Sequence, residues 1–200
     1  MNSTKVSFSD KELALLNEKD FWIERKILSD KLMELLNSVK ESIRLTPLFN
    51  QIAWLDGTDL TNGKITRGEN YLSFPWMVLD FPRLISGDNL LLYRTMIWWG
   101  NGCSSSLVVQ GGYLNEAKKS LVNQLPDLLS QHILFATATD AWVHNPNDDS
   151  NLLMSEITAE KFPEQNYIKL MKKIPMNELE NLPEISAANF ELLAKILTRS

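Results

Sequence analysis

The segment RTMIWWGNGCSSSLVVQGG, residues 94–112, constrains the fold more than any other part of the sequence. Its Asn101-Gly102 dipeptide lies between two apolar runs, and Asn-Gly is the strongest short-range hairpin signal because both central residues of a type I′ turn need positive φ. We therefore predict two antiparallel strands joined at these two residues, with Trp98 facing Ser105. In this register the small serines at 104–106 leave room for the facing indoles.

The same segment offers little for catalysis. It contains no Gly-x-Ser-x-Gly elbow, and GNG is not followed by the Lys-Ser/Thr pair or the helix of a phosphate-binding loop. Cys103 lies beside a turn and not at a helix N-terminus, where its pKa would be lowered. The titratable residues inside apolar stretches are few, namely Asp80, Asp140 and His132. The candidate catalytic residues are Asp80, His132 and Cys103.

Helical patterns flank this β-rich middle. Ser9 and Glu12 form a capping-box pattern, and apolar residues then step by three and four as far as Pro47. We predict an α+β fold: an antiparallel sheet of about five to six strands, packed by two N-terminal helices, one central helix and one C-terminal helix. A single globular domain, 1–200, is expected, and its segments are helical 9–46, β-rich 51–112, helix 113–125, strands 131–174 and C-terminal helix 184–198.

Two short patterns refine the second half of the chain. We expect Pro126 to end the central helix or to open a turn. Between residues 168 and 174, apolar residues alternate with Lys169 and Lys173, which is typical of a strand with one face in water.

Composition excludes several classes of protein. The net charge of −5 and the absence of a Lys/Arg cluster argue against a nucleic-acid binder. One cysteine cannot form an internal disulfide and fits a reducing compartment. No signal peptide is visible, and the apolar runs are too short to span a bilayer. We expect a soluble cytoplasmic protein with no membrane partner, and the sequence leaves a homodimer open.

Arg94 is the residue that most needs an explanation. Strand alternation places it on one face with Met96 and Trp98, and the turn at residues 101–102 would set it opposite Val109. Burying its charge without a partner costs several kcal/mol, so it must stack on an aromatic ring, pair with a carboxylate or meet an anionic ligand. Asp80, within the apolar run WMVLDF, has the complementary need, and a buried Asp80–Arg94 pair would satisfy both.

Three classes of function stay open. The first is a binding module for a small organic anion or a peptide, with a pocket lined by Trp76, Arg83, Arg94 and Trp98. The second is an adaptor that docks a partner through the Trp-rich middle or the amphipathic N-terminal helix. The third is an enzyme that uses Asp80 as a base and an arginine as an anchor. The identity of the ligand or partner is not encoded in any motif.

Neither a metal nor another cofactor is expected. His132 and His144 would lie about 40 Å apart on one straight strand. Only a reversal near residues 137–139 would make them face each other, with Asp140 and Cys103 as the obvious further ligands. Histidines that simply flank a strand at the surface are far more common.

Overall fold

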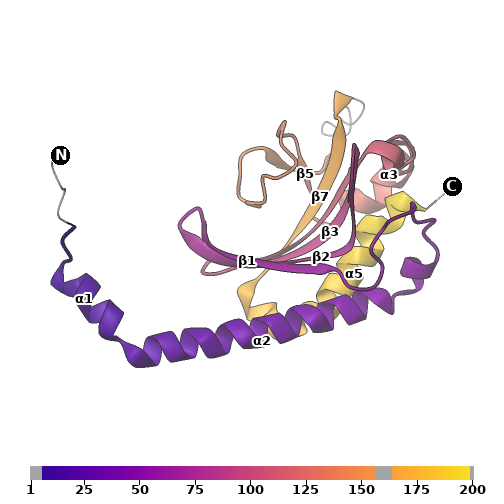
Figure 1. Cartoon of the computed structure of the whole chain (residues 1–200). Coiled ribbons are helices and arrows are strands. Elements are labelled where there is room, and N and C mark those ends of the chain that lie inside the picture. Colours follow the sequence, from indigo (N-terminus) through magenta and orange to yellow (C-terminus); the bar gives the residue numbers. More distant parts are fainter. Residues whose placement is uncertain (1–5, 156–163, 199–200) are drawn as a thin grey trace. The chain divides into compact units, whose positions relative to one another are not determined.

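A computed structural model describes residues 6–155 and 164–198 of the chain. It confirms the α+β class with an antiparallel sheet (Figure 1). The described helices and strands are α1 (Asp10–Asn17), α2 (Lys19–Arg44), η1 (Pro47–Asn50), β1 (Lys64–Tyr71), β2 (Phe74–Ser86), β3 (Asn89–Trp98), β4 (Gly102–Gln110), η2 (Gly111–Tyr113), α3 (Leu114–Leu129), β5 (Leu134–Ala136), β6 (Asn151–Leu153), β7 (Tyr167–Ile174), η4 (Met176–Asn181), α5 (Leu182–Ala194) and η5 (Lys195–Leu197).

Backbone contacts divide the chain into two compact units, residues 1–34 and 35–200, each considered by itself. In the first unit, the capping box predicted before α1 is present. The Ser9 hydroxyl accepts the Glu12 N–H at 3.3 Å, and the Glu12 carboxylate accepts the Ser9 N–H at 2.7 Å. The indole N–H of Trp22 on α2 donates to the Leu15 carbonyl at 3.0 Å, which links α2 to α1. The prediction of one domain stays a prediction.

The second unit contains the sheet, whose order is β1-β2-β3-β4-β7-β5-β6 with antiparallel pairing throughout. Within residues 6–155 and 164–198 it has seven strands, slightly more than the five to six expected. The strand-rich region predicted for residues 131–174 yields three of them, β5, β6 and β7, and residues 156–163 lie outside the described part. In the described part, no helix combines the length and the apolar character that crossing a bilayer requires.

The β3–β4 hairpin forms, but the predicted turn was wrong by a shift in register. Trp98 pairs with Gly102, so residues 99–101 form the loop and Arg94 faces Ser106, not Val109. The Asn101 N–H donates to the Trp98 carbonyl at 2.9 Å, and φ is positive at Gly100 (71°), within the loop, and at Gly102 (115°), where β4 begins. Gly100 matters for the turn type. It is the third position of a four-residue turn, where a type II turn needs glycine.

One face of the sheet packs against α5. The Tyr93 hydroxyl donates to the Ser186 carbonyl at 2.6 Å, and the Ser186 hydroxyl lies 2.6 Å from the Thr95 hydroxyl and 3.4 Å from that of Ser105. All four residues are buried, and Phe190 of the same helix contacts the Tyr93 ring edge-on. Odd-numbered residues of β3 and β4 therefore form the helix-covered face, which leaves the even-numbered residues for the opposite face.

Helix α3 does not end at the proline. It continues through Pro126 to Leu129. The proline removes one backbone donor in the last helical turn, and the full burial of Leu128 in that turn supplies compensating apolar contact.

The segment between β5 and β6, residues 137–150, is a loop, so the strand-rich region predicted for residues 131–174 is interrupted there. Side chains bind the backbone two residues further on at three places: Asp140 accepts the Trp142 N–H at 2.8 Å, Asn145 accepts that of residue 147 at 2.9 Å, and Asp148 accepts that of Ser150 at 3.0 Å. Such local bonds compete with strand pairing and favour turns.

Candidate functional site

A pocket of about 260 Å³ lies on the face of the sheet opposite α5. Strands β1, β2 and β3 supply its floor, and the loop 137–150 supplies one wall. The lining residues are Lys64, Thr66, Tyr71, Trp76, Val78, Asp80, Arg83, Ile85, Arg94, Met96, Trp142 and His144.

The floor contains the ion pair that the sequence offered as one of three explanations for Arg94. Asp80 and Arg94 are direct partners in the β2–β3 register. Arg94 Nε donates to Asp80 Oδ1 at 2.6 Å and Nη2 donates to Oδ2 at 2.8 Å, so the pair is bidentate. Only 7% of the Asp80 side chain and 11% of the Arg94 side chain are exposed. Both charges are therefore compensated at the base of the pocket.

A β-bulge brings a second arginine to the same face. Asp80 pairs with Arg94, but three residues later Arg83 pairs with Leu92, so the register shifts between them. Simple alternation would place Asp80 and Arg83 on opposite faces of the sheet. The extra residue of the bulge shifts the alternation by one, so both side chains lie on the same face. Arg83 consequently lines the pocket, as the sequence proposed.

Trp76 lies flat across a glycine of the neighbouring strand. Gly68 on β1 pairs with Trp76 on β2, and a Cβ atom added at Gly68 would stand 2.7 Å from the indole Nε1, Cε2 and Cζ2. The missing side chain is therefore what allows the indole to cover β1 at one end of the pocket.

The Gly68→Ala substitution tests this arrangement. Because the added methyl overlaps the indole, we expect Trp76 to move and the protein to lose about 1–3 kcal/mol of unfolding free energy. Urea unfolding and the near-ultraviolet circular dichroism of the tryptophans measure the two effects. Arg67→Ala, on the same strand but exposed, is the control, and a Gly68→Ala variant identical to it in both measurements would contradict the stacked geometry.

The loop wall completes the surroundings of Arg94. The guanidinium carbon lies 5.4 Å from the centre of the Trp142 ring, within the range of a cation–π contact. Arg94 Nη1 also contacts Nε2 of His144, and the His144 backbone N–H donates to the Tyr71 hydroxyl at 3.0 Å. Arg94 thus meets a carboxylate and an aromatic ring, two of the three partners that its burial demanded.

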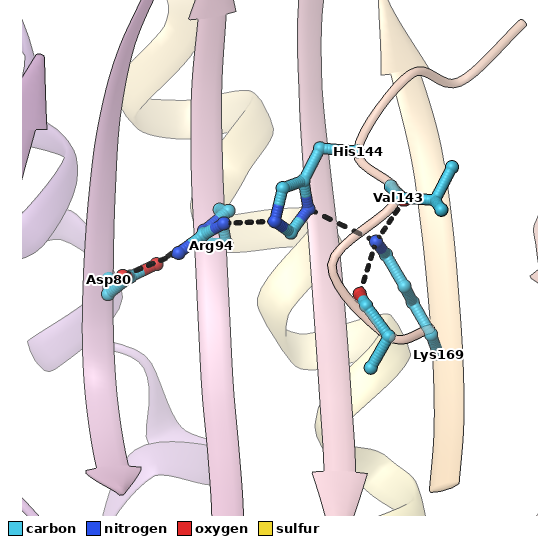
Figure 2. Close-up of polar contacts among 6 residues, drawn as sticks. Asp80, Arg94, Val143, His144 and Lys169 are labelled. Carbon is cyan, nitrogen blue, oxygen red and sulfur yellow. Dashed lines mark hydrogen bonds and ion pairs between the residues drawn. The ribbon is translucent and has the colours of Figure 1, made fainter. Parts of the chain in front are cut away.

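Lys169 extends this network onto β7, where the prediction of a water-facing side chain was wrong. The residue is 0% exposed. Its Nζ lies 2.9 Å from the Ala141 carbonyl oxygen, 2.5 Å from that of Val143 and 3.1 Å from His144 Nδ1. Figure 2 shows the resulting row, in which His144 bridges the space over β4 between Arg94 on β3 and Lys169 on β7.

Burial changes the proton affinity of Lys169 and of His144. It lowers the pKa of Lys169 to about 7, and the nearby Arg94 charge acts in the same direction while Asp140 opposes it. Burial, with the Lys169 and Arg94 charges, lowers the pKa of His144 to about 2. The His144 ring is therefore neutral near neutral pH.

The remaining predicted residues lie elsewhere. Trp98 is buried and does not line the pocket; its indole N–H donates to the Tyr71 carbonyl at 3.1 Å and its ring contacts the Tyr71 ring edge-on. Cys103 is buried on the helix side, and burial raises the pKa of its thiol to about 11, so it is not a thiolate at neutral pH. His132 is exposed after α3 in a left-handed conformation, φ 52°.

Neither histidine has the surroundings of a metal ligand. His144 is held between Arg94 and Lys169, and both of its ring nitrogens face nitrogen atoms. Within residues 6–155 and 164–198, no three His, Cys, Asp or Glu side chains gather where they could hold a metal ion.

Sequence reasoning missed Lys64, Trp142, His144 and Lys169. Lys64 pairs with Asp80 across β1 and β2, but its strand, KITRGENY, has little apolar alternation to announce it. Trp142 and His144 reach the pocket from a loop, and no local pattern encodes where a loop lies. The pattern around Lys169 was misleading. Lysines that alternate with apolar residues occur both on a solvent-exposed face and in a buried polar network, so the pattern does not distinguish the two.

Comparisons with protein families, with curated proteins and with solved structures find no match for this chain.

Proposed function

We propose that the chain is a binding module whose pocket takes a small organic anion, with the anionic group at Arg83 and the apolar part against Trp76 and Trp142. The lining residues include three basic side chains, Lys64, Arg83 and Arg94, but a single carboxylate, Asp80. Basic side chains therefore outnumber carboxylates in a partly apolar, aromatic lining, which is how sites for small anions are commonly built. Asp59, outside the lining, forms a β-bridge with Arg83 and is the carboxylate that an anion at Arg83 would have to compete with.

The observation that carries the proposal is the state of Arg83. Its Nε is buried and has no hydrogen-bond partner among the described residues. A buried polar atom without a partner costs about 1–3 kcal/mol, so such atoms are uncommon. Among the described side chains Gln124 Oε1 and Asn151 Oδ1 share this state, but only Arg83 Nε belongs to a residue that lines the pocket. An anionic oxygen at this position would satisfy Nε, and guanidinium groups bind carboxylates with strong, charge-assisted bonds.

The size of the pocket favours a compact ligand over a peptide. About 260 Å³ lies below the range typical of drug-sized ligands, so one carboxylate with a small ring or chain is the expected occupant. The enzyme alternative gains no support from the lining, because both oxygens of Asp80 bind Arg94 and both ring nitrogens of His144 are engaged. The adaptor alternative stays a prediction.

Benzoate, a compact aromatic carboxylate, is the probe for this proposal. We expect it to quench or shift tryptophan fluorescence in the wild type, because Trp76 and Trp142 line the pocket. The Arg83→Met variant should bind benzoate about 10- to 100-fold more weakly, since a charge-assisted bond contributes about 1.5–3 kcal/mol.

The matched control is Arg67→Met, an exposed arginine of β1 outside the lining. It removes the same charge and should leave benzoate affinity unchanged. Equal losses in both variants would indicate a general charge effect, and no binding by the wild type at millimolar benzoate would reject the proposal.

A further inference from the structure

The environment of the Lys169 amine restricts its protonation state. Its Nζ lies against the carbonyl oxygens of Ala141 and Val143, which can only accept, and against His144 Nδ1 (Figure 2). On the other side of the ring, His144 Nε2 lies against Arg94 Nη1. A neutral imidazole has one N–H and one acceptor nitrogen, so the two contacts of His144 must have opposite polarity.

Arg94 determines which ring nitrogen of His144 donates and which accepts. A guanidinium only donates and does not lose its proton in proteins, so His144 Nε2 must accept and the ring proton must lie on Nδ1. The Nδ1–H then donates to Lys169 Nζ. An ammonium has three donors and no acceptor, whereas a neutral amine has two N–H groups for the two carbonyls and one lone pair for His144. The contacts of the structure are thus fully satisfied by a neutral Lys169.

A protonated Lys169 requires a different arrangement. Its third N–H would donate to His144 Nδ1, the ring proton would move to Nε2, and this N–H would face the N–H groups of Arg94. Two opposed donors repel, so Arg94 Nη1 would separate from His144. An anion in the pocket can accept from that freed N–H, and its charge also stabilises the new ammonium.

The other charged groups near Lys169 are few. Arg94 on β3 disfavours the ammonium, Asp140 in the loop favours it, and Asp80 on β2 is held to Arg94. On β7 itself, Lys173 binds Asn147 Oδ1 at 2.7 Å and the Tyr167 hydroxyl donates to the Ala138 carbonyl at 2.5 Å. The amine is therefore balanced between opposing neighbours, and its lowered pKa of about 7 agrees with the hydrogen-bond count.

We propose that Lys169 is a neutral amine in this network and that binding of an anion at Arg83 and Arg94 is coupled to uptake of one proton by Lys169. The inference rests on the proposed anion site and adds its regulation by pH. Because the bound anion favours the protonated lysine, affinity must be higher at low pH and must fall as the pH rises through neutrality.

The test uses the full-length protein and benzoate, which keeps its charge throughout the range studied. Calorimetric titrations at pH 8 in Hepes and in Tris, which differ in ionisation heat, measure the protons exchanged on binding. We expect uptake of about one proton and an affinity that falls towards tenfold per unit between pH 7 and pH 9. Lys169→Gln cannot titrate, so its affinity should not vary with pH and its proton uptake should vanish.

A second measurement covers the case in which Lys169→Gln does not fold. The Cε resonance of Lys169 in the ¹³C-labelled wild type should titrate near pH 7 without benzoate, and above pH 7 its midpoint should rise when benzoate is added. Benzoate binding without proton uptake, or a midpoint near the usual pKa of lysine, would overturn the inference. Absence of benzoate binding at pH 6 would instead reject the anion site itself.

Discussion

Replacing Arg94 with methionine is expected to lower the free energy of unfolding by about 3–5 kcal/mol, the cost typical of breaking a buried ion pair by removing one partner. The reason is Asp80, whose two oxygens both accept from Arg94 and whose side chain is only 7% exposed. Without the guanidinium, its charge would be buried without a partner, and either protonation or local opening must follow. Urea unfolding at pH 7 measures the loss.

The double variant Asp80→Leu/Arg94→Met separates the pair from the packing around it. It removes both charges, so we expect it to recover most of the lost stability, since buried pairs are often replaced by apolar residues at little cost. Arg67→Met, which removes an exposed arginine from the same unit, should change stability by less than about 0.5 kcal/mol. An Arg94→Met protein as stable as this control would show that the ion pair does not stabilise the fold.

The sequence predicts the part of the site that follows from the two-residue alternation of side chains along single strands. Alternation along β3 puts Arg94 beside Met96, and the apolar run before Asp80 marks a second buried charge. Two buried, opposite charges on neighbouring strands need each other, and this physical need does not depend on the turn. The pair was therefore predictable although the register assumed for the β3–β4 hairpin was wrong.

The rest of the site depends on long-range placement. Arg83 was named as a pocket residue, but the bulge that brings it to the face of Asp80 inserts one residue without a strong local signature. His144 and Trp142 come from a loop shaped by Asp140 and other local caps, which encode turns but not the strand that the loop covers. The strand that carries Lys169 was predicted, but the burial of this side chain was not, because it depends on the loop that covers β7.

Stability should depend on pH through Lys169. Its pKa falls from the ordinary 10.5 to about 7 in the folded protein. Between these values the unfolded chain holds a proton that the folded chain does not, so the free energy of unfolding rises with pH, by about 1.4 kcal/mol per unit. Below pH 7 Lys169 is protonated in both states, so the free-energy cost of burying a charged amine is constant. Above pH 10.5 Lys169 is neutral in both states, and this cost is absent. The contribution therefore grows across the window from pH 7 upwards.

The Lys169→Met variant isolates this contribution. It leaves the carbonyls of Ala141 and Val143 without their donor, which lowers stability by the same amount at every pH. Other groups, such as Cys103 and Tyr93, whose pKa values burial raises, titrate equally in both proteins. The difference between wild type and variant should consequently increase by about 2–3 kcal/mol from pH 7 to pH 9 in urea unfolding. Because the packing cost cancels in this slope, parallel curves would mean that Lys169 keeps its proton on folding, and then His144 could not accept from Arg94.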